Sequence, residues 1–149
     1  MKTLICLQLT LVASIATAGD WKGHEAILMD HPTIVACHRI QTEHRKRNGL
    51  RPQTLNGELC RVAQEWSEFM ARTGSFSHSP YNVAENIATG SRSASGTMDQ
   101  WIGSRGHNAN LLSGGSQVGF GVAESPAGQR YWTSCHGSGF KIHKRLEGE

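Results

Sequence analysis

The sequence predicts one α+β domain, in which helices come first along the chain and a β-hairpin comes last. Two patterns support this fold class: apolar residues at helical spacing between residues 32 and 73, and alternating apolar residues after residue 116. The 149 residues fall within the size range of a single domain and can bury a hydrophobic core. The sequence shows no repeat and no second domain.

The first 18 residues are typical of a signal peptide. Lys2 gives a positive start, Leu4–Ala16 is mostly apolar, and Ala16-Thr17-Ala18 supplies the small residues that a signal peptidase accepts. A membrane anchor is the alternative, but the apolar run is shorter than the roughly 20 residues that span a bilayer. No later stretch is apolar enough to span. We therefore expect a secreted protein, in which residues 19–32 form an irregular lead-in.

Two helices are expected in the first half of the domain. The first begins at Pro32, which suits the first position of a helix, and ends at Asn48-Gly49. The second begins after Asn56, a good N-cap, and ends at Thr73-Gly74. Its apolar residues recur at helical spacing: Leu59, Val62, Ala63, Trp66, Phe69 and Met70. This periodicity favours the core over a ligand-binding role for Trp66 and Met70.

Residues 74–96 are rich in Ser, Gly and Asn, and the stretch is longer than a purely structural loop in a compact domain. It contains one apolar cluster, which is compatible with either a helical turn or a short strand: Val83, Ala84, Ile87 and Ala88. A third, short helix is expected over Thr97–Ser104.

The last part of the sequence predicts a β-hairpin. Residues 116–125 and 130–137 are strand-like and flank a Pro- and Gly-containing turn. Glycines on one face of a strand let another element pack very close. In the first strand, glycines alternate with apolar residues in the order Val118, Gly119, Phe120, Gly121 and Val122.

Three cysteines remain after the signal peptide: Cys37, Cys60 and Cys135. In an oxidising compartment, this odd number suggests one disulfide and one buried or reactive thiol, and the sequence leaves the pairing open. The absence of C-x-x-C spacing argues against a cysteine zinc site. The net charge of +3 is too small to indicate a nucleic-acid partner.

Several segments occur in a characteristic order: residues 42–79, which end in FSHS, then AENIATG, then WIGSRGHNANLL, then VGFGVA and YWTSCHG. In this order they resemble the motifs of the CAP superfamily, also called the SCP or TAPS domain, in its compact bacterial form. The likeness extends from about Ile34 to Gly137. It implies an α-β-α sandwich with a central antiparallel sheet over residues 33–140, followed by a polar tail at residues 141–149.

The resemblance also implies a polar cleft, which family members line with two histidines and two acidic residues and which in some binds zinc or another divalent cation. The histidines fall on His78 and His107, and one acid falls on Glu85. Ser104 matches the position of the second acid. Two imidazoles and a carboxylate suit zinc and leave room for water. Glu85 is either a third ligand or a hydrogen-bond partner that orients a histidine.

We expect a non-enzymatic extracellular protein that binds a divalent metal, together with a small ligand, a lipid or a protein partner. One alternative is a metal-assisted hydrolase that uses His78, Glu85 and His107, with a bound water as nucleophile. A serine hydrolase built from Ser104, His107 and Glu85 is disfavoured, because nothing supplies an obvious oxyanion hole. The other alternative is a sterol- or lipid-binding module, for which the candidate apolar residues are few: Tyr81, Phe120, Trp132 and Phe140.

Overall fold

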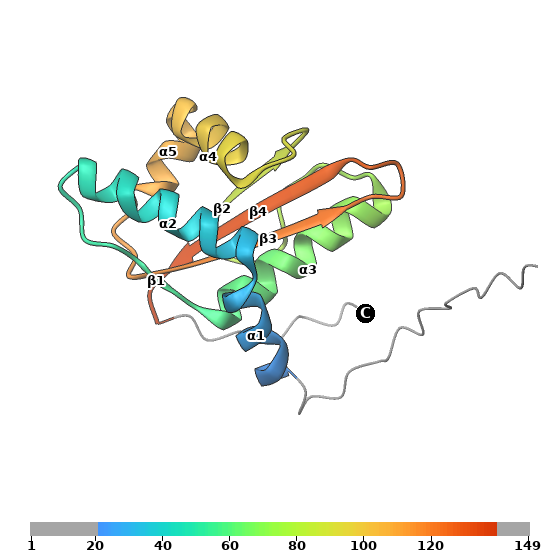
Figure 1. Cartoon of the computed structure of the whole chain (residues 1–149), viewed down its shortest axis with the longest axis horizontal. Helices are drawn as coiled ribbons and strands as arrows, with labels where there is room; N and C mark the ends of the chain where they lie inside the picture. Colours follow the sequence, from blue (N-terminus) through green and yellow to red (C-terminus); the bar gives the residue numbers. More distant parts are fainter. Residues whose placement is uncertain (1–20, 140–149) are drawn as a thin grey trace, which may run out of the picture.

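The computed structural model describes residues 21–139, so the expected signal peptide, the polar tail and Phe140 lie outside the described residues. Figure 1 shows the elements in chain order. Their bounds are α1 (Trp21–Asp30), α2 (Pro32–Arg47), β1 (Thr54–Leu55), α3 (Gly57–Thr73), β2 (Ala84–Thr89), α4 (Ala94–Gly103), α5 (Arg105–Leu111), β3 (Gln117–Glu124) and β4 (Arg130–Gly137). Within residues 21–139, no helix is long and apolar enough to cross a membrane.

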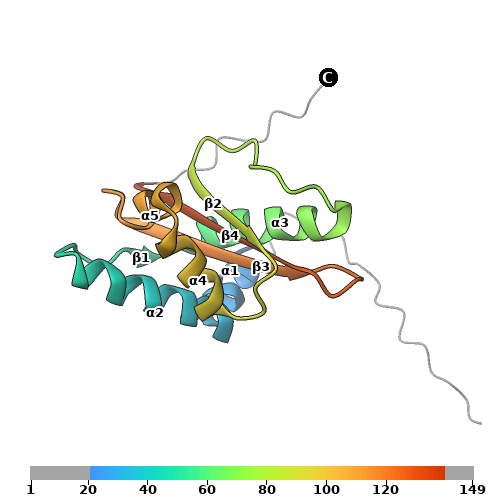
Figure 2. The same cartoon turned by 90° about the horizontal axis from the view of Figure 1, so that it is seen from above.

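A four-stranded sheet in the order β1-β3-β4-β2 forms the middle layer. The strands β3, β4 and β2 pair antiparallel, and the two-residue β1 pairs parallel with β3. Figure 2 shows α3 on one side of this sheet and α2, α4 and α5 on the other. The expected α-β-α sandwich is confirmed. The parallel edge strand β1 was not expected, since a two-residue strand leaves no alternating pattern in the sequence.

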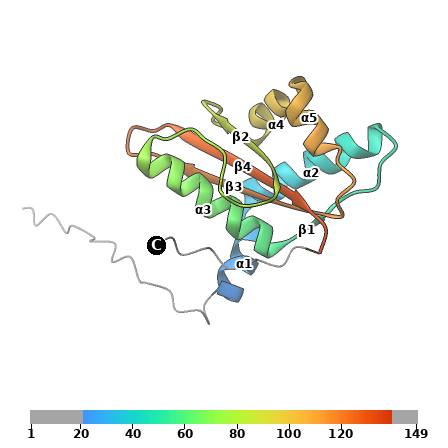
Figure 3. The ribbon, with the colours of Figure 1, turned by 180° about the vertical axis from the view of Figure 1, so that it is seen from behind.

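The helix α3 rests directly on the sheet because two glycines remove the side chains beneath it. Figure 3 shows α3 lying across β3 and β4. A Cβ at Gly119 would lie 2.2 Å from the Cys60 backbone nitrogen, and one at Gly121 would lie 2.3 Å from the Gln64 backbone nitrogen. The close packing predicted from the alternating glycines is confirmed. The ends of α3 are also as expected: Asn56 Oδ1 accepts a hydrogen bond from Leu59 N, and Gly74 has a φ of 72°.

Residues 21–30, which were expected to be irregular, form α1. This expectation is wrong because the helix depends on its neighbours more than on its own sequence. Its Leu28 and Met29 pack against the main core, and its Glu25 lies so close to α3 that a Cβ at Gly57 would be 2.8 Å from Glu25 Cβ.

Two segments around the candidate site are now defined. The apolar cluster at residues 83–88 lies largely in a strand, β2, and not in a helical turn. The short helix expected over Thr97–Ser104 is α4, and it begins and ends earlier. A second helix, α5, follows without a loop, because Ser104 adopts extended backbone angles (φ −104°, ψ 119°) between them. Consequently, His107 lies on α5.

The three cysteines are buried and free, so the expected disulfide is not formed. Cys37 and Cys60 lie in the main core cluster, whereas Cys135 lies in a separate cluster under α3. Burial raises the pKa of Cys37 to about 12 and that of Cys60 to about 11, and it raises the pKa of Cys135 as well. Since the thiolate is the reactive form, these side chains act as apolar core residues.

Candidate functional site

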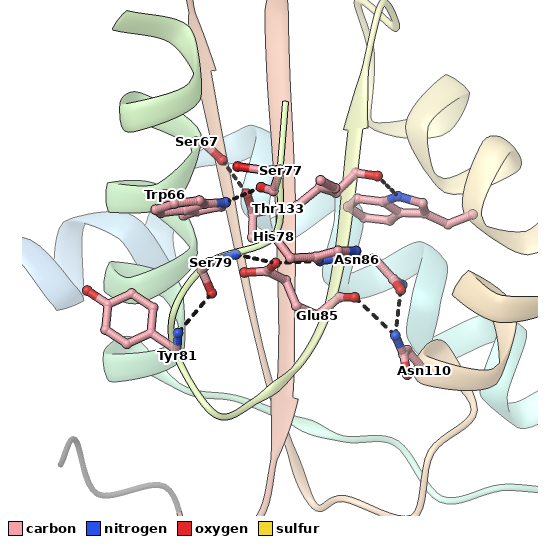
Figure 4. Close-up of polar contacts among 12 residues, drawn as sticks. Trp66, Ser67, Ser77, His78, Ser79, Tyr81, Glu85, Asn86, Asn110 and Thr133 are labelled. Carbon is pink, nitrogen blue, oxygen red and sulfur yellow. Dashed lines mark hydrogen bonds and ion pairs between the residues drawn. The ribbon is translucent and has the colours of Figure 1, made fainter. Parts of the chain in front are cut away.

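The loop between α3 and β2, residues 74–83, carries His78 and is held at several points along its length. Trp66 Nε1 of α3 donates a hydrogen bond to Ser77 O at 2.8 Å. The backbone nitrogen of Ser79 donates to Glu85 Oε1 of β2 at 3.0 Å. Figure 4 shows both contacts on either side of His78. The loop is therefore anchored to α3 and to β2 where it presents this histidine.

His78 and Glu85 form a hydrogen-bonded pair, with 2.7 Å between Nδ1 and Oε1 (Figure 4). The Glu85 side chain is only 4% exposed, while that of His78 is 63% exposed. Because a carboxylate oxygen accepts, Nδ1 of His78 carries the proton in this bond, and in the neutral ring Nε2 keeps its lone pair. Glu85 Oε2 is buried and has no hydrogen-bond partner. The buried Glu85 carboxylate therefore holds the His78 ring through Nδ1, and the Nε2 atom of the exposed ring is left without a partner in this pair.

His107 is held in a related way but by a neutral group. Its Nδ1 lies 2.9 Å from Ser104 Oγ, at the start of the same helix. Its backbone oxygen accepts a hydrogen bond from Asn86 Nδ2 at 3.1 Å. The ring is half-buried and makes no bond through Nε2 among the described residues. Ser104, which stands at the position of the second acid of the family, therefore orients His107 through a hydroxyl.

The structure joins two of the predicted residues, His78 and Glu85, by a direct hydrogen bond, and among residues 21–139 His107 is bonded to neither of them. The same part of the chain contains no group of three or more His, Cys, Asp and Glu side chains that could hold a metal ion. Since Glu85 Oε1 already accepts from His78 and Ser79 and Oε2 is buried, the geometry favours an orienting role for Glu85 over that of a third ligand.

Two asparagines connect the halves of the site. Asn86 on β2 is fully buried, and Asn110 on α5 donates to both Glu85 O and Asn86 Oδ1. The sequence analysis did not identify Asn110. Its signal is its spacing from His107, because residues three apart on a helix share a face.

A second polar cluster lies in the interior, between α2, the segment before β1 and β4. His136 Nδ1 contacts Gln53 Oε1 at 3.3 Å, and its Nε2 contacts Ser134 Oγ at 3.0 Å. Burial, with a contribution from the nearby Arg45, lowers the pKa of His136 to about 3. Nothing in the sequence distinguishes this histidine from the exposed ones. It belongs to the core and not to the candidate site of His78, Glu85 and His107.

The geometry gives no support to the serine hydrolase alternative. Ser104 and His107 are in contact, but the acid that would complete a triad, Glu85, bonds His78 instead. Three of the four apolar residues expected for the lipid alternative lie in the described part of the chain, and they do not gather on one surface there. Phe120 and Trp132 belong to the main core, and Tyr81 is half-buried with its hydroxyl on Glu65.

The CAP family, described as the cysteine-rich secretory protein family, has a sequence profile that matches residues 38–136, and the chain belongs to this family. The match contains His78, Glu85, Ser104 and His107. No curated protein matches the chain significantly.

Solved structures show the same fold at low sequence identity. An outer surface protein of Borrelia burgdorferi is 16% identical, with a TM-score of 0.59 over 83% of this chain and 96% of that one. A cysteine-rich secretory protein of Staphylococcus aureus is 18% identical, with a TM-score of 0.54 over 70% of this chain and 38% of that one. At these identities the likeness concerns the fold alone.

Proposed function

We propose that this chain is an extracellular CAP-domain protein that binds a divalent metal ion such as zinc, with Nε2 of His78 and Nε2 of His107 as its protein ligands. The observation that carries this proposal is the 2.7 Å bond between the buried Glu85 carboxylate and Nδ1 of the exposed His78. Histidines that bind metals almost always donate their other N–H to such a partner.

The residues present fit a site with two protein ligands. Both rings are bonded through Nδ1. Nε2 of His78 can then coordinate, and so can Nε2 of His107 in the tautomer in which Nδ1 donates to Ser104 Oγ. Zinc is almost always held by four ligands in structural sites and by three protein ligands plus water in catalytic ones. With only two, the remaining positions fall to water or to a bound partner, so the affinity is expected to be low. A site of this kind suits recognition of a small ligand or a protein group.

Two features support an extracellular location. Residues 1–18 have the charge and apolar pattern of a signal peptide. The chain also belongs to the cysteine-rich secretory protein family. Expression with residues 1–18 intact, followed by sequencing of the mature N-terminus, tests this part of the proposal. We expect cleavage after Ala18, and retention of these residues on the secreted protein would contradict it.

The metal site is tested by titrating zinc into the secreted protein by calorimetry. We expect saturable binding near one zinc per chain, which is lost in His78→Ala and in His107→Ala. The matched control is His31→Asn, since His31 is an exposed histidine that caps α2 and asparagine also caps helices. Binding that survives both alanine variants, or that disappears in the control, would contradict the site. No binding to the unaltered protein would overturn the proposal.

A further inference from the structure

A ring of amide hydrogen bonds joins α5 to β2. Asn110 Nδ2 donates to Glu85 O at 3.1 Å and to Asn86 Oδ1 at 2.9 Å. Asn86 Nδ2 in turn donates to His107 O at 3.1 Å. Figure 4 shows Asn110 reaching from α5 to both residues of β2. The ring therefore connects the backbone of Glu85, which holds His78, to the backbone of His107.

Covering the open edge of β2 explains only some of these hydrogen bonds. The outer edge of β2 has two carbonyl oxygens that accept bonds from side chains: Glu85 O from Asn110, and Ile87 O from Trp101 Nε1 at 3.3 Å. Both bonds cover an edge strand that would otherwise be open to pairing. Asn86, on the edge strand itself, bonds the His107 backbone directly. Of the two side chains that cover the edge, Asn110 alone also bonds Asn86 Oδ1, so it holds the amide that makes this link.

The hydrogen bonds between α5 and β2 matter for the proposed metal site because it has only two protein ligands. A third ligand would help to fix the separation of the two imidazoles, but Glu85 Oε1 is bonded to His78 and Ser79, Glu85 Oε2 is buried, and a serine stands at the position of the second acid. The separation then depends on how α5 is placed against β2. Resting on the proposed function, we propose that Asn110 is a positioning residue of the metal site, which fixes α5 on β2 and thereby sets the distance between the Nε2 atoms of His78 and His107.

The test compares two variants that each uncover one backbone carbonyl of the same strand edge, of which only Asn110→Ala also removes the bond to Asn86. Asn110→Ala removes the bonds to Glu85 and Asn86, whereas Trp101→Phe removes the bond to Ile87 and keeps most of the buried ring. Asn110→Ser is a milder variant that retains one donor, for use if Asn110→Ala does not fold. Zinc affinity is measured by calorimetry and the melting temperature by circular dichroism.

We expect Asn110→Ala to weaken zinc binding about tenfold, the lower end of the range for residues that orient ligands. Asn110→Ser should lose less. Trp101→Phe should lower the melting temperature while keeping the affinity of the unaltered protein. If the affinities of Asn110→Ala and Trp101→Phe fall together with their melting temperatures, the role of Asn110 is structural only, and the proposal is overturned.

A second measurement needs no metal. In the zinc-free protein, the ring signals of His78 and His107 are followed by nuclear magnetic resonance. Asn110→Ala should shift both, although Asn110 touches neither ring, because Glu85 and the His107 backbone move with the loss of the ring of amides. Trp101→Phe should shift neither. If the unaltered protein binds no zinc, the proposed function fails, and these signals alone decide the positioning role: unshifted rings in Asn110→Ala overturn it.

Discussion

Two histidines close to neighbouring strands of the same sheet, His78 and His136, are held in opposite ways. His136 is 3% exposed, and both of its nitrogens are bonded to neutral groups, Ser134 and Gln53. His78 is 63% exposed and bonded through one nitrogen to a buried carboxylate. Glu85, which bonds His78, lies on the strand next to that of His136: Glu85 pairs with Cys135, and its neighbour Ala84 pairs with His136.

The difference lies in what each arrangement leaves available. Gln53 Oε1 accepts from Gln41 Nε2 and is therefore a carbonyl that requires a donor from His136, so Nδ1 of that ring carries the proton and Nε2 accepts from Ser134. No position on His136 is left for a ligand. His78 keeps a free nitrogen in solvent, and a carboxylate partner suits a metal-bound ring. A histidine suited to binding is thus distinguished by its partners and exposure.

The largest expected effect comes from removing the hub of the interior cluster. Gln53→Ala would leave His136, Gln41 and Gly115 O without their side-chain partner in the core. Unsatisfied buried groups are costly, so we expect the free energy of unfolding to fall by about 3 kcal/mol or more. His78→Ala, at the exposed site, should cost about 1 kcal/mol or less. Urea denaturation measures both, and equal losses would contradict the division between the two clusters.

The next effect is a dependence of stability on pH that comes from the interior histidine, His136. The folded-state pKa of His136, about 3, lies below the ordinary 6.5, so the folded protein binds fewer protons than the unfolded chain between these values. Stability is therefore fully present above about pH 6.5 and is lost as the pH falls, by about 3 kcal/mol at pH 4.5. Urea denaturation at several pH values should show this slope in His78→Ala and a shallower one in His136→Phe. Parallel slopes in the unaltered protein and His136→Phe would refute the assignment.

The core elements of this protein could be predicted from the sequence better than the contacts of the candidate site. The helix α3 and its glycine-lined strand leave strong patterns, since a cap, a helical period and two glycines each restrict local structure. The pairing of His78 with Glu85 could be expected only from the motif order. Three features depend on distances between elements: the orienting role of Glu85 toward His78, the break between α4 and α5 at Ser104, and the hydrogen bonds of Asn110 to β2. The helix α1 depends on its packing against the core. No local pattern encodes these features.

A smaller effect is expected from the carboxylate that distinguishes His78. Glu85→Gln keeps the shape of the side chain and removes its charge, so the bond to His78 loses its charge-assisted character. We expect zinc affinity to fall about tenfold, as for other groups that orient a ligating histidine. Calorimetry checks the affinity, and thermal unfolding in the absence of zinc shows whether the fold is kept. An unchanged affinity would mean that Glu85 serves the loop alone, through its bond from Ser79.

The smallest effect on zinc affinity is expected at His107. It compares a histidine held by a hydroxyl with one held by a carboxylate, His78. Ser104→Ala removes the hydroxyl that holds His107 Nδ1, a bond between neutral groups that is about half as strong as one to a carboxylate. We expect zinc affinity to fall only about threefold, less than in Glu85→Gln, because α5 still fixes the backbone of His107. The control is Ser95→Ala, which removes an exposed serine hydroxyl from α4. If Ser104→Ala weakens zinc binding as much as Glu85→Gln does, then a hydroxyl orients an imidazole as well as a buried carboxylate, and the asymmetry between the two histidines has no consequence for binding.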